Sequence, residues 1–318
     1  MSSNYKIREL QIVWYGGEPL LEWPFIHFIN DELISLSERF GMKYNNIIVT
    51  NGYLLDESIA RALGKQNIEY VQITLDGTEH IHNLRRRIAN GGGSYSTILQ
   101  GISYLLNNNI NTVIRINVDK ESINSISSLI DELYRKYKKY VKTKLLSLDI
   151  ARVYGYRKSF SLSDFYYMCR NIWLKTVHYG FITPSLQVAG IGTFCGAERD
   201  SLTDIVVDIF GNLYKCWNYV FVKGANYSTL EELAEHNYEI IPQNRNRLRY
   251  VEKASLLSIN NGKCLSCNYF PYCQGLCPDL RLRIMKSLEE NIYNRDKCKS
   301  IVKDYLETQI EALLSSKE

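Results

Sequence analysis

The sequence predicts an α/β protein in two parts, a parallel sheet with crossover helices followed by a small cysteine-rich domain. Between residues 11 and 152, short β-rich runs alternate with longer segments of helical periodicity. After residue 184 this alternation stops, and seven of the eight cysteines fall between residues 195 and 298. We place the first domain at residues 1–160 and the second at residues 185–318.

The first part contains five apolar runs that are short enough to be strands. We expect these strands at residues 11–15, 46–50, 71–75, 112–118 and 145–150. Continuous apolar runs of this kind suit strands that are buried on both faces. Helices are expected between them, at residues 24–40, 56–63, 95–107 and 123–137. The alternation implies parallel strands with right-handed crossovers, but periodicity alone does not choose between a doubly wound sheet and an incomplete barrel.

A helix at residues 161–179 leads into the second part, where the expected elements are shorter. Two β-rich runs at residues 204–208 and 213–216 flank a Gly-Asn turn and predict a hairpin. The expected helices lie near residues 230–234 and 244–257 and at residues 295–315, the last with apolar residues near one face.

Composition excludes several classes of protein. The net charge of +4 is too small to indicate nucleic acid, and the basic stretch at residues 134–144 is interpreted as a solvated helix end. No apolar run approaches the roughly 20 residues of a membrane span, and the N-terminus lacks the apolar core of a signal peptide. We therefore expect a cytoplasmic protein without nucleic-acid or membrane partners, in which thiols stay reduced.

The cysteines carry the strongest signal. Four thiolates within fourteen residues cannot all point into an apolar core, but they can surround a soft metal centre. Seven ligands make one complete four-thiolate site and one that is short by one, which favours iron–sulfur clusters, while a structural zinc pair stays open as an alternative. The candidate metal ligands are Cys195, Cys216, Cys264, Cys267, Cys273, Cys277 and Cys298.

The spacing of these seven cysteines, together with Gly211, resembles the SPASM domain of radical S-adenosylmethionine (SAM) enzymes and matches that motif at every position. The first part is similar to the barrel of the same family, in its peptide-maturase and sulfatase-maturase branch. The matching segments are Gly-Gly-Glu-Pro at residues 16–19, the turn at residues 50–55, Thr-Leu-Asp-Gly at residues 74–77, His-Asn-Leu-Arg-Arg at residues 82–86 and Arg-Ile-Asn-Val at residues 115–118.

The resemblance implies a (β/α)6 radical SAM barrel, with ligands at the carboxyl ends of its strands. It further implies two auxiliary [4Fe–4S] clusters, a precursor peptide or protein as substrate, and a reductant such as a flavodoxin or ferredoxin. The outer cluster takes Cys264, Cys267, Cys273 and Cys298, and the inner one takes Cys195, Cys216 and Cys277 with an unassigned fourth ligand. The SAM-binding residues it implies are Gly16, Gly17, Glu18, Thr74, Asp76, Arg86 and Asn117.

Three further residues or segments are interpreted as structural. Cys169 is expected to be a buried helix residue rather than the missing cluster ligand, although the ligand role stays open. His82 is expected to pack or cap rather than act as a base. The glycine-rich loop at residues 90–94 invites a phosphate-binding interpretation, which we reject because no lysine accompanies it.

One departure from the family pattern decides the expected activity. Family enzymes hold the radical-generating cluster with a Cys-x3-Cys-x2-Cys loop after the first strand, but residues 1–168 contain no cysteine. In addition, the first of the five expected strands is followed by the Gly-Gly-Glu-Pro motif, which family members carry after their second strand. We therefore expect an incomplete barrel that lacks the first βα unit, an N-terminally truncated chain, with SAM binding weak or lost and no catalytic residue assigned.

Three functions remain open from the sequence. The first is a radical SAM peptide maturase represented without its N-terminal part. The second is a non-catalytic iron–sulfur partner protein, and the third is a structural zinc protein. The upstream reading frame separates the first two, and metal and sulfide analysis separates the third.

Overall fold

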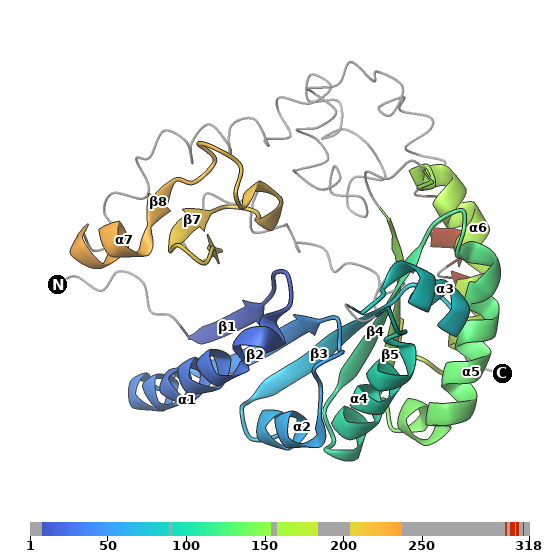
Figure 1. Cartoon of the computed structure of the whole chain (residues 1–318), viewed down its shortest axis with the longest axis horizontal. Coiled ribbons are helices and arrows are strands. Elements are labelled where there is room, and N and C mark those ends of the chain that lie inside the picture. Colours follow the sequence, from blue (N-terminus) through green and yellow to red (C-terminus); the bar gives the residue numbers. More distant parts are fainter. Residues whose placement is uncertain are drawn as a thin grey trace. The chain divides into compact units, whose positions relative to one another are not determined.

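The computed structural model describes residues 8–88, 91–153, 158–183 and 204–236, and single helical positions between residues 303 and 314 (Figure 1). The chain divides into two compact units. The first comprises Met1–Gln187 with Asp304–Glu318, and the second comprises Val188–Lys303. The helix expected at residues 244–257 lies outside the described residues, as does most of the one expected at residues 295–315.

The first unit is built on a sheet of five parallel strands, and all five expected strands are confirmed within a few residues. Each strand pairs with the strand that precedes or follows it in the chain, in the order β1-β2-β3-β4-β5. The strands are β1 (Glu9–Trp14), β2 (Lys43–Thr50), β3 (Ile68–Leu75), β4 (Thr112–Val118) and β5 (Leu146–Arg152).

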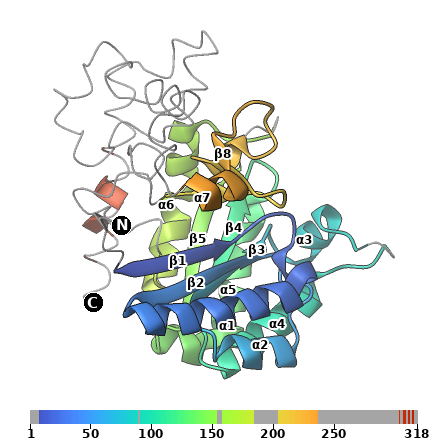
Figure 2. The ribbon, with the colours of Figure 1, turned by 90° about the vertical axis from the view of Figure 1, so that its left-hand side faces the viewer.

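The sequential order decides between the two architectures that periodicity left open. A doubly wound sheet reverses its strand order and carries helices on both faces. Here the order never reverses, and the crossover helices lie on one face of the sheet (Figures 1 and 2). The described sheet is therefore consistent with a radical SAM barrel and not with a doubly wound fold.

The expected helices of the first unit are also confirmed, and two short helical elements of that unit were missed. The helices are α1 (Trp23–Phe40), α2 (Glu57–Leu63), α4 (Tyr95–Asn107), α5 (Ile123–Lys142) and α6 (Leu162–His178). The missed elements are a 3-10 turn, η1 (Pro19–Glu22), and α3 (Glu79–Arg85). Both are too short to show a helical period. Helix α5 continues past its expected end at Tyr137, where the backbone leaves helical geometry at φ −118° and ψ 15°.

The core lies between the sheet and its helices. Strands β3 and β4 bury every second side chain on the helix-covered face, among them Val71, Ile73, Ile114 and Ile116, each with no exposed surface. The alternate residues on the other face are half-buried and mostly polar. This division follows from the two-residue period of a strand and leaves a polar face that is available for chemistry.

The two edges of the sheet differ. At β5, the backbone N–H of Leu148 donates to the carbonyl oxygen of Ile182 at 2.9 Å, and α6 packs nearby with Cys169 and Trp173 buried. At β1, the described residues provide β2 as the neighbouring strand and nothing on the other side. Val13 is 42% exposed there.

The second unit is described over residues 204–236. Strands β6 (Val206–Val207) and β7 (Asn212–Tyr214) form the expected antiparallel hairpin, and β8 (Ser228–Thr229) adds a third strand that was not expected. Helix α7 (Leu230–His236) follows it. The turn of the hairpin is held by Asp208, whose carboxylate accepts hydrogen bonds from the backbone N–H groups of Phe210 and Asn212, both at 2.9 Å.

None of the described helices combines the length and the apolar character needed to cross a bilayer.

Candidate functional site at the carboxyl ends of the strands

The candidate SAM-binding residues of the first unit lie at or just beyond the carboxyl ends of β1, β3 and β4. Gly16, Gly17 and Glu18 follow β1, Thr74 is the next-to-last residue of β3, Asp76 directly follows β3, and Asn117 is the next-to-last residue of β4. Arg86 comes directly after α3, in the connection that leaves β3. Parallel strands bring all these ends to one edge of the sheet, so the fold brings residues up to 101 positions apart to one side.

Glu18 ties the end of β1 to the end of β2. Its carboxylate accepts hydrogen bonds from the Thr50 hydroxyl at 2.6 Å, the Asn51 backbone N–H at 2.7 Å and the Leu20 backbone N–H at 3.0 Å. Three donors hold both oxygens in place. The Gly-Gly-Glu-Pro and Thr-Asn-Gly segments therefore form one hydrogen-bonded unit, a link that the sequence alone did not indicate.

Gly16 and Gly17 leave open space at the end of β1. Both are exposed, and a Cβ atom built on either would meet no atom within 4 Å in the described protein. The positions therefore provide backbone that a ligand can approach closely.

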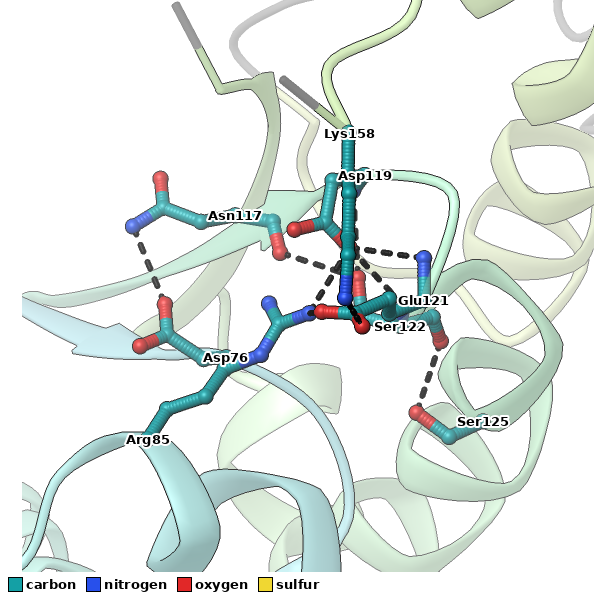
Figure 3. A network of polar contacts seen from close by, with 8 residues as sticks. All are labelled: Asp76, Arg85, Asn117, Asp119, Glu121, Ser122, Ser125 and Lys158. Atoms are coloured by element: carbon teal, nitrogen blue, oxygen red, sulfur yellow. Dashed lines mark hydrogen bonds and ion pairs between the residues drawn. The ribbon is translucent and has the colours of Figure 1, made fainter. Parts of the chain in front are cut away.

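A carboxylate-centred network joins β3, β4 and the connection after α3. The Nε–H of Arg86 donates to Asp76 Oδ2 at 2.6 Å, and the Asn117 amide donates to Asp76 Oδ1 at 3.1 Å. Asp76 is 7% exposed, so the guanidinium stabilises a nearly buried charge. Three of the seven candidate SAM residues thus form a direct contact chain (Figure 3 shows Asp76 and Asn117).

Gly77, directly after Asp76, is a position that only glycine fits. Its φ is +139°, and a Cβ would lie 2.9 Å from the Ser125 hydroxyl oxygen and 3.0 Å from the Ile81 side chain. Such contacts are too short for a real side chain. The glycine of the Thr-Leu-Asp-Gly motif is therefore required by the close approach of α5 to the end of β3.

A second charged cluster lies beside the first (Figure 3). Arg85 donates to Asp119 Oδ1 at 2.8 Å, and the backbone N–H groups of Glu121 and Ser122 donate to the same carboxylate, both at 2.9 Å. Burial acts to raise the pKa of Asp119, but the hydrogen bonds from Arg85 and Ser122 outweigh it and lower the pKa. Lys158 pairs with Glu121 at the rim of this cluster.

Thr74 lies within β3, two residues before Asp76, on the polar face of the sheet. It pairs in register with Arg115 on β4, which in turn pairs with Asp149 on β5. Arg115 donates to Asp149 Oδ2 at 2.8 Å, and both side chains are partly exposed. The row places a hydroxyl, a guanidinium and a carboxylate side by side below the Asp76 network.

His82 is confirmed as a packing residue rather than a base. It has no exposed surface, and burial lowers the pKa of its imidazole to about 4. Both ring nitrogens have hydrogen-bonding partners, the Asp76 backbone N–H and the Ser94 hydroxyl. At neutral pH the ring is therefore uncharged and fixed in place.

Two of the eight cysteines lie among the described residues. Cys169 is fully buried in α6, and burial raises the pKa of its thiol to about 12, which fits the expected core residue. Cys216 is half-buried just after β7. The remaining candidate ligands, Cys195, Cys264, Cys267, Cys273, Cys277 and Cys298, lie outside the described residues.

Sequence reasoning found the ends of the strands but missed several of the residues that organise them. Thr50, Arg85, Ser94 and Asp119 were not singled out. The only available signal was their position, since each lies within or just after a quoted motif or strand. Which charged group pairs with which depends on the spatial neighbours of a strand end, and a single sequence does not report those.

Comparison with known proteins agrees with this geometry. Residues 5–151 match the model of the Radical SAM superfamily. The cysteine-type anaerobic sulfatase-maturating enzyme of Clostridium perfringens strain 13 is 25% identical over 284 residues, which are 82% of this chain and 72% of the relative.

Solved structures align with nearly the whole length of this chain. The structure of native anSMEcpe with bound AdoMet has a TM-score of 0.69 at 19% identity, covering 99% of this chain and 87% of that one. A second structure, native anSMEcpe with bound AdoMet and Kp18Cys peptide, has a TM-score of 0.67 at 20% identity, covering 98% and 86%. Residues 5–151 of this chain therefore form a Radical SAM domain, and the chain is homologous to the anaerobic sulfatase-maturating enzymes.

Proposed function

We propose that this protein is a radical SAM maturase that modifies a peptide or protein substrate, with a SPASM domain in its cysteine-rich second part. The observations that carry the proposal are the Asp76–Arg86–Asn117 network and the open backbone of Gly16 and Gly17, which lie at the same edge of the sheet. They lie at the carboxyl ends of the strands in a domain that matches the Radical SAM superfamily. A structural role alone does not require open backbone at this edge.

The described residues fit SAM as a ligand. The open backbone at Gly16 and Gly17, where a Cβ would meet no atom within 4 Å, would let the methionine part approach closely, with its amino group near backbone carbonyls. Arg86 uses its Nε–H for Asp76 and is one-third exposed, so its two terminal nitrogens can face a carboxylate. Thr74 and Asn117 would hydrogen-bond the ribose and the carboxylate. Bound next to a cluster that donates one electron, SAM would supply the chemistry for hydrogen abstraction from the substrate.

Binding of SAM to the 318-residue chain tests this assignment. We expect weak but measurable binding, and about tenfold weaker binding in Arg86→Gln, because one charge-assisted hydrogen bond is lost. Arg61→Gln is the matched control, since Arg61 forms an exposed pair with Glu57 on α2. Equal affinities in both variants would contradict the assignment.

The cysteine spacing supports two [4Fe–4S] clusters in the second part. Anaerobically prepared protein should contain about eight irons with matching acid-labile sulfide. Cys267→Ala should lose the outer cluster and destabilise the second unit, because cluster binding and folding are coupled there. Stoichiometric zinc without sulfide would contradict the proposal and favour the structural zinc protein.

A peptide is the proposed substrate class, and a small redox protein such as a flavodoxin or ferredoxin is the proposed electron donor. The support for a peptide is the homology to maturases, together with the structural likeness to a chain solved with AdoMet and a Cys peptide. The bond that is formed and the identity of the peptide remain unassigned.

One observation, the absence of cysteine from residues 1–168, favours a second candidate function, that of a non-catalytic iron–sulfur partner protein. Because residues 1–168 contain no cysteine, this chain alone should not turn SAM over to 5′-deoxyadenosine under dithionite. Joining a βα unit with a Cys-x3-Cys-x2-Cys loop ahead of β1 should give turnover. If turnover stays absent while both clusters are intact, the protein is a non-catalytic iron–sulfur partner. Turnover by the chain alone would overturn both interpretations.

A further inference from the structure

His82 connects the main chains of the two residues that form the central ion pair. Its Nδ1 accepts a hydrogen bond from the Asp76 backbone N–H at 3.3 Å. Its Nε2 lies 3.1 Å from the Ser94 hydroxyl oxygen, and that hydroxyl donates to the carbonyl oxygen of Arg86 at 2.9 Å. The ring and one hydroxyl thus link the main chains of Asp76 and Arg86. The side chains of the same two residues contact each other directly, with Arg86 Nε 2.6 Å from Asp76 Oδ2.

These contacts fix the protonation state of the ring. Because Nδ1 accepts a backbone hydrogen bond, the proton of the neutral imidazole lies on Nε2 and is donated to the Ser94 hydroxyl. The hydroxyl has one proton and gives it to the Arg86 carbonyl, so every donor and acceptor of the bridge is used once. Asp76 and Arg86 are the charged groups that act on the ring, and their effects oppose each other.

The bridge is surrounded by close packing contacts. His82 packs edge-on against Tyr95 at a centroid distance of 5.7 Å. The adjacent Asn83 accepts a hydrogen bond from the Tyr95 backbone N–H at 3.0 Å, which ties α3 to the start of α4. A Cβ at Gly93 would lie 2.3 Å from the Asn83 side chain, so the glycine-rich loop must pass close to this position. The bridge therefore has little freedom to shift.

We propose that His82 is a positioning residue that sets the separation of Asp76 and Arg86 and thereby the aim of the Arg86 guanidinium. This inference rests on the proposed function, since the guanidinium is assigned there to the SAM carboxylate. On this inference, the residues of the His-Asn-Leu-Arg-Arg motif have separate structural roles. His82 holds Asp76 and Arg86 apart at a fixed distance, Asn83 anchors α4, and Arg85 binds Asp119.

The first measurement needs no ligand. In the ¹⁵N-labelled full chain, hydrogen exchange of the Arg86 Nε–H reports its hydrogen bond to Asp76. We expect exchange about tenfold faster in His82→Phe and in Ser94→Ala, each of which removes part of the bridge. Thr176→Val is the matched control, because it also removes a fully buried hydroxyl, at a hydrogen-bonded site in α6. Unchanged Arg86 exchange in both bridge variants would overturn the proposal.

The conservative replacement His82→Asn covers the case in which His82→Phe does not fold. Its amide oxygen retains an acceptor close to the position of Nδ1 but does not reach Ser94. We expect it to keep the Asp76 backbone amide protected while Arg86 exchange rises. Equal loss of protection at both residues would show a general loosening and would contradict a specific bridge.

A double-mutant cycle then links the bridge to the ligand. His82→Phe should weaken SAM binding about tenfold in the native background and have little further effect in Arg86→Gln, because both act through one guanidinium. Additive losses would overturn the positioning role. If the native chain does not bind SAM while Arg86 exchange still responds to His82→Phe, the proposed SAM site fails and the bridge stands.

Discussion

The two outer strands of the five-stranded sheet have opposite surroundings. Beyond β5, a backbone hydrogen bond joins Leu148 to Ile182, and α6 buries Cys169 and Trp173 nearby. Beyond β1, no described residue pairs with the strand, and Val13 and Tyr15 are 42% and 59% exposed. The same sheet is thus covered at one edge and open at the other among the described residues.

The helix that accompanies β1 repeats the difference. Phe25, Phe28 and Phe40 of α1 are 56%, 60% and 62% exposed, whereas the apolar face of α5 is almost completely buried. An open strand edge beside an apolar helix surface is a surface that proteins usually cover or protect with charge. We therefore expect stability to be concentrated towards β5, and the β1 side to be the one that can associate further.

The largest effect is expected at the covered edge. Trp173→Ala should cost about 3–5 kcal/mol of unfolding free energy, because it leaves a cavity among Phe165, Tyr166 and Cys169. Denaturant unfolding of the full chain measures it.

Phe28→Ala on the open side is the matched aromatic truncation. Because Phe28 is mostly exposed, its removal should change the unfolding free energy by no more than about 0.5 kcal/mol. Similar losses in the two variants would break the comparison, since they would show that something covers α1.

A smaller effect is expected from pH, in the packed part of the sheet. Burial lowers the pKa of His82 from 6.5 to about 4, so the unfolded chain binds more protons between these values. The stabilisation from neutral His82 is therefore complete above pH 6.5 and falls as the pH drops to about 4, by about 3 kcal/mol in total. His82→Asn should flatten this part of the pH–stability curve, and an unchanged slope would contradict the assignment.

The smallest change in stability, and the sharpest change in association, is expected at the open edge. The 318-residue chain should self-associate through β1 and α1, measured as a concentration-dependent mass by sedimentation. Val13→Lys places a charge on that edge and should reduce association while altering stability by no more than about 0.5 kcal/mol. Lys120→Gln, an exposed charge change away from β1, serves as the control.

Much of the fold follows from sequence, and particular residues show why. Strands β3 and β4 were predictable because Val71, Ile73, Ile114 and Ile116 repeat at a strand period between clear helical segments. Helix α3 was missed because its seven residues, Glu79–Arg85, are mostly polar and turn fewer than two times. The short β8 depends on its pairing with β7 and carries no pattern of its own.

The location of the site was predictable from the sequence, but the hydrogen-bond pairings within it were not. Motifs located Glu18, Asp76, Arg86 and Asn117 at the strand ends, because parallel strands end on one side. They did not reveal that Glu18 binds Thr50 or that Asp76 accepts from both Arg86 and Asn117. Those pairings depend on the neighbour order and stagger of the strands, which tertiary packing decides.

The strand order also has a consequence for how this sheet forms. Every strand pair joins segments that are adjacent along the chain, so each pairing closes a loop of a few tens of residues. Loop closure of that size costs little more entropy than a shorter one. The sheet can therefore grow by adding one strand at a time during synthesis, with no strand waiting for a distant segment.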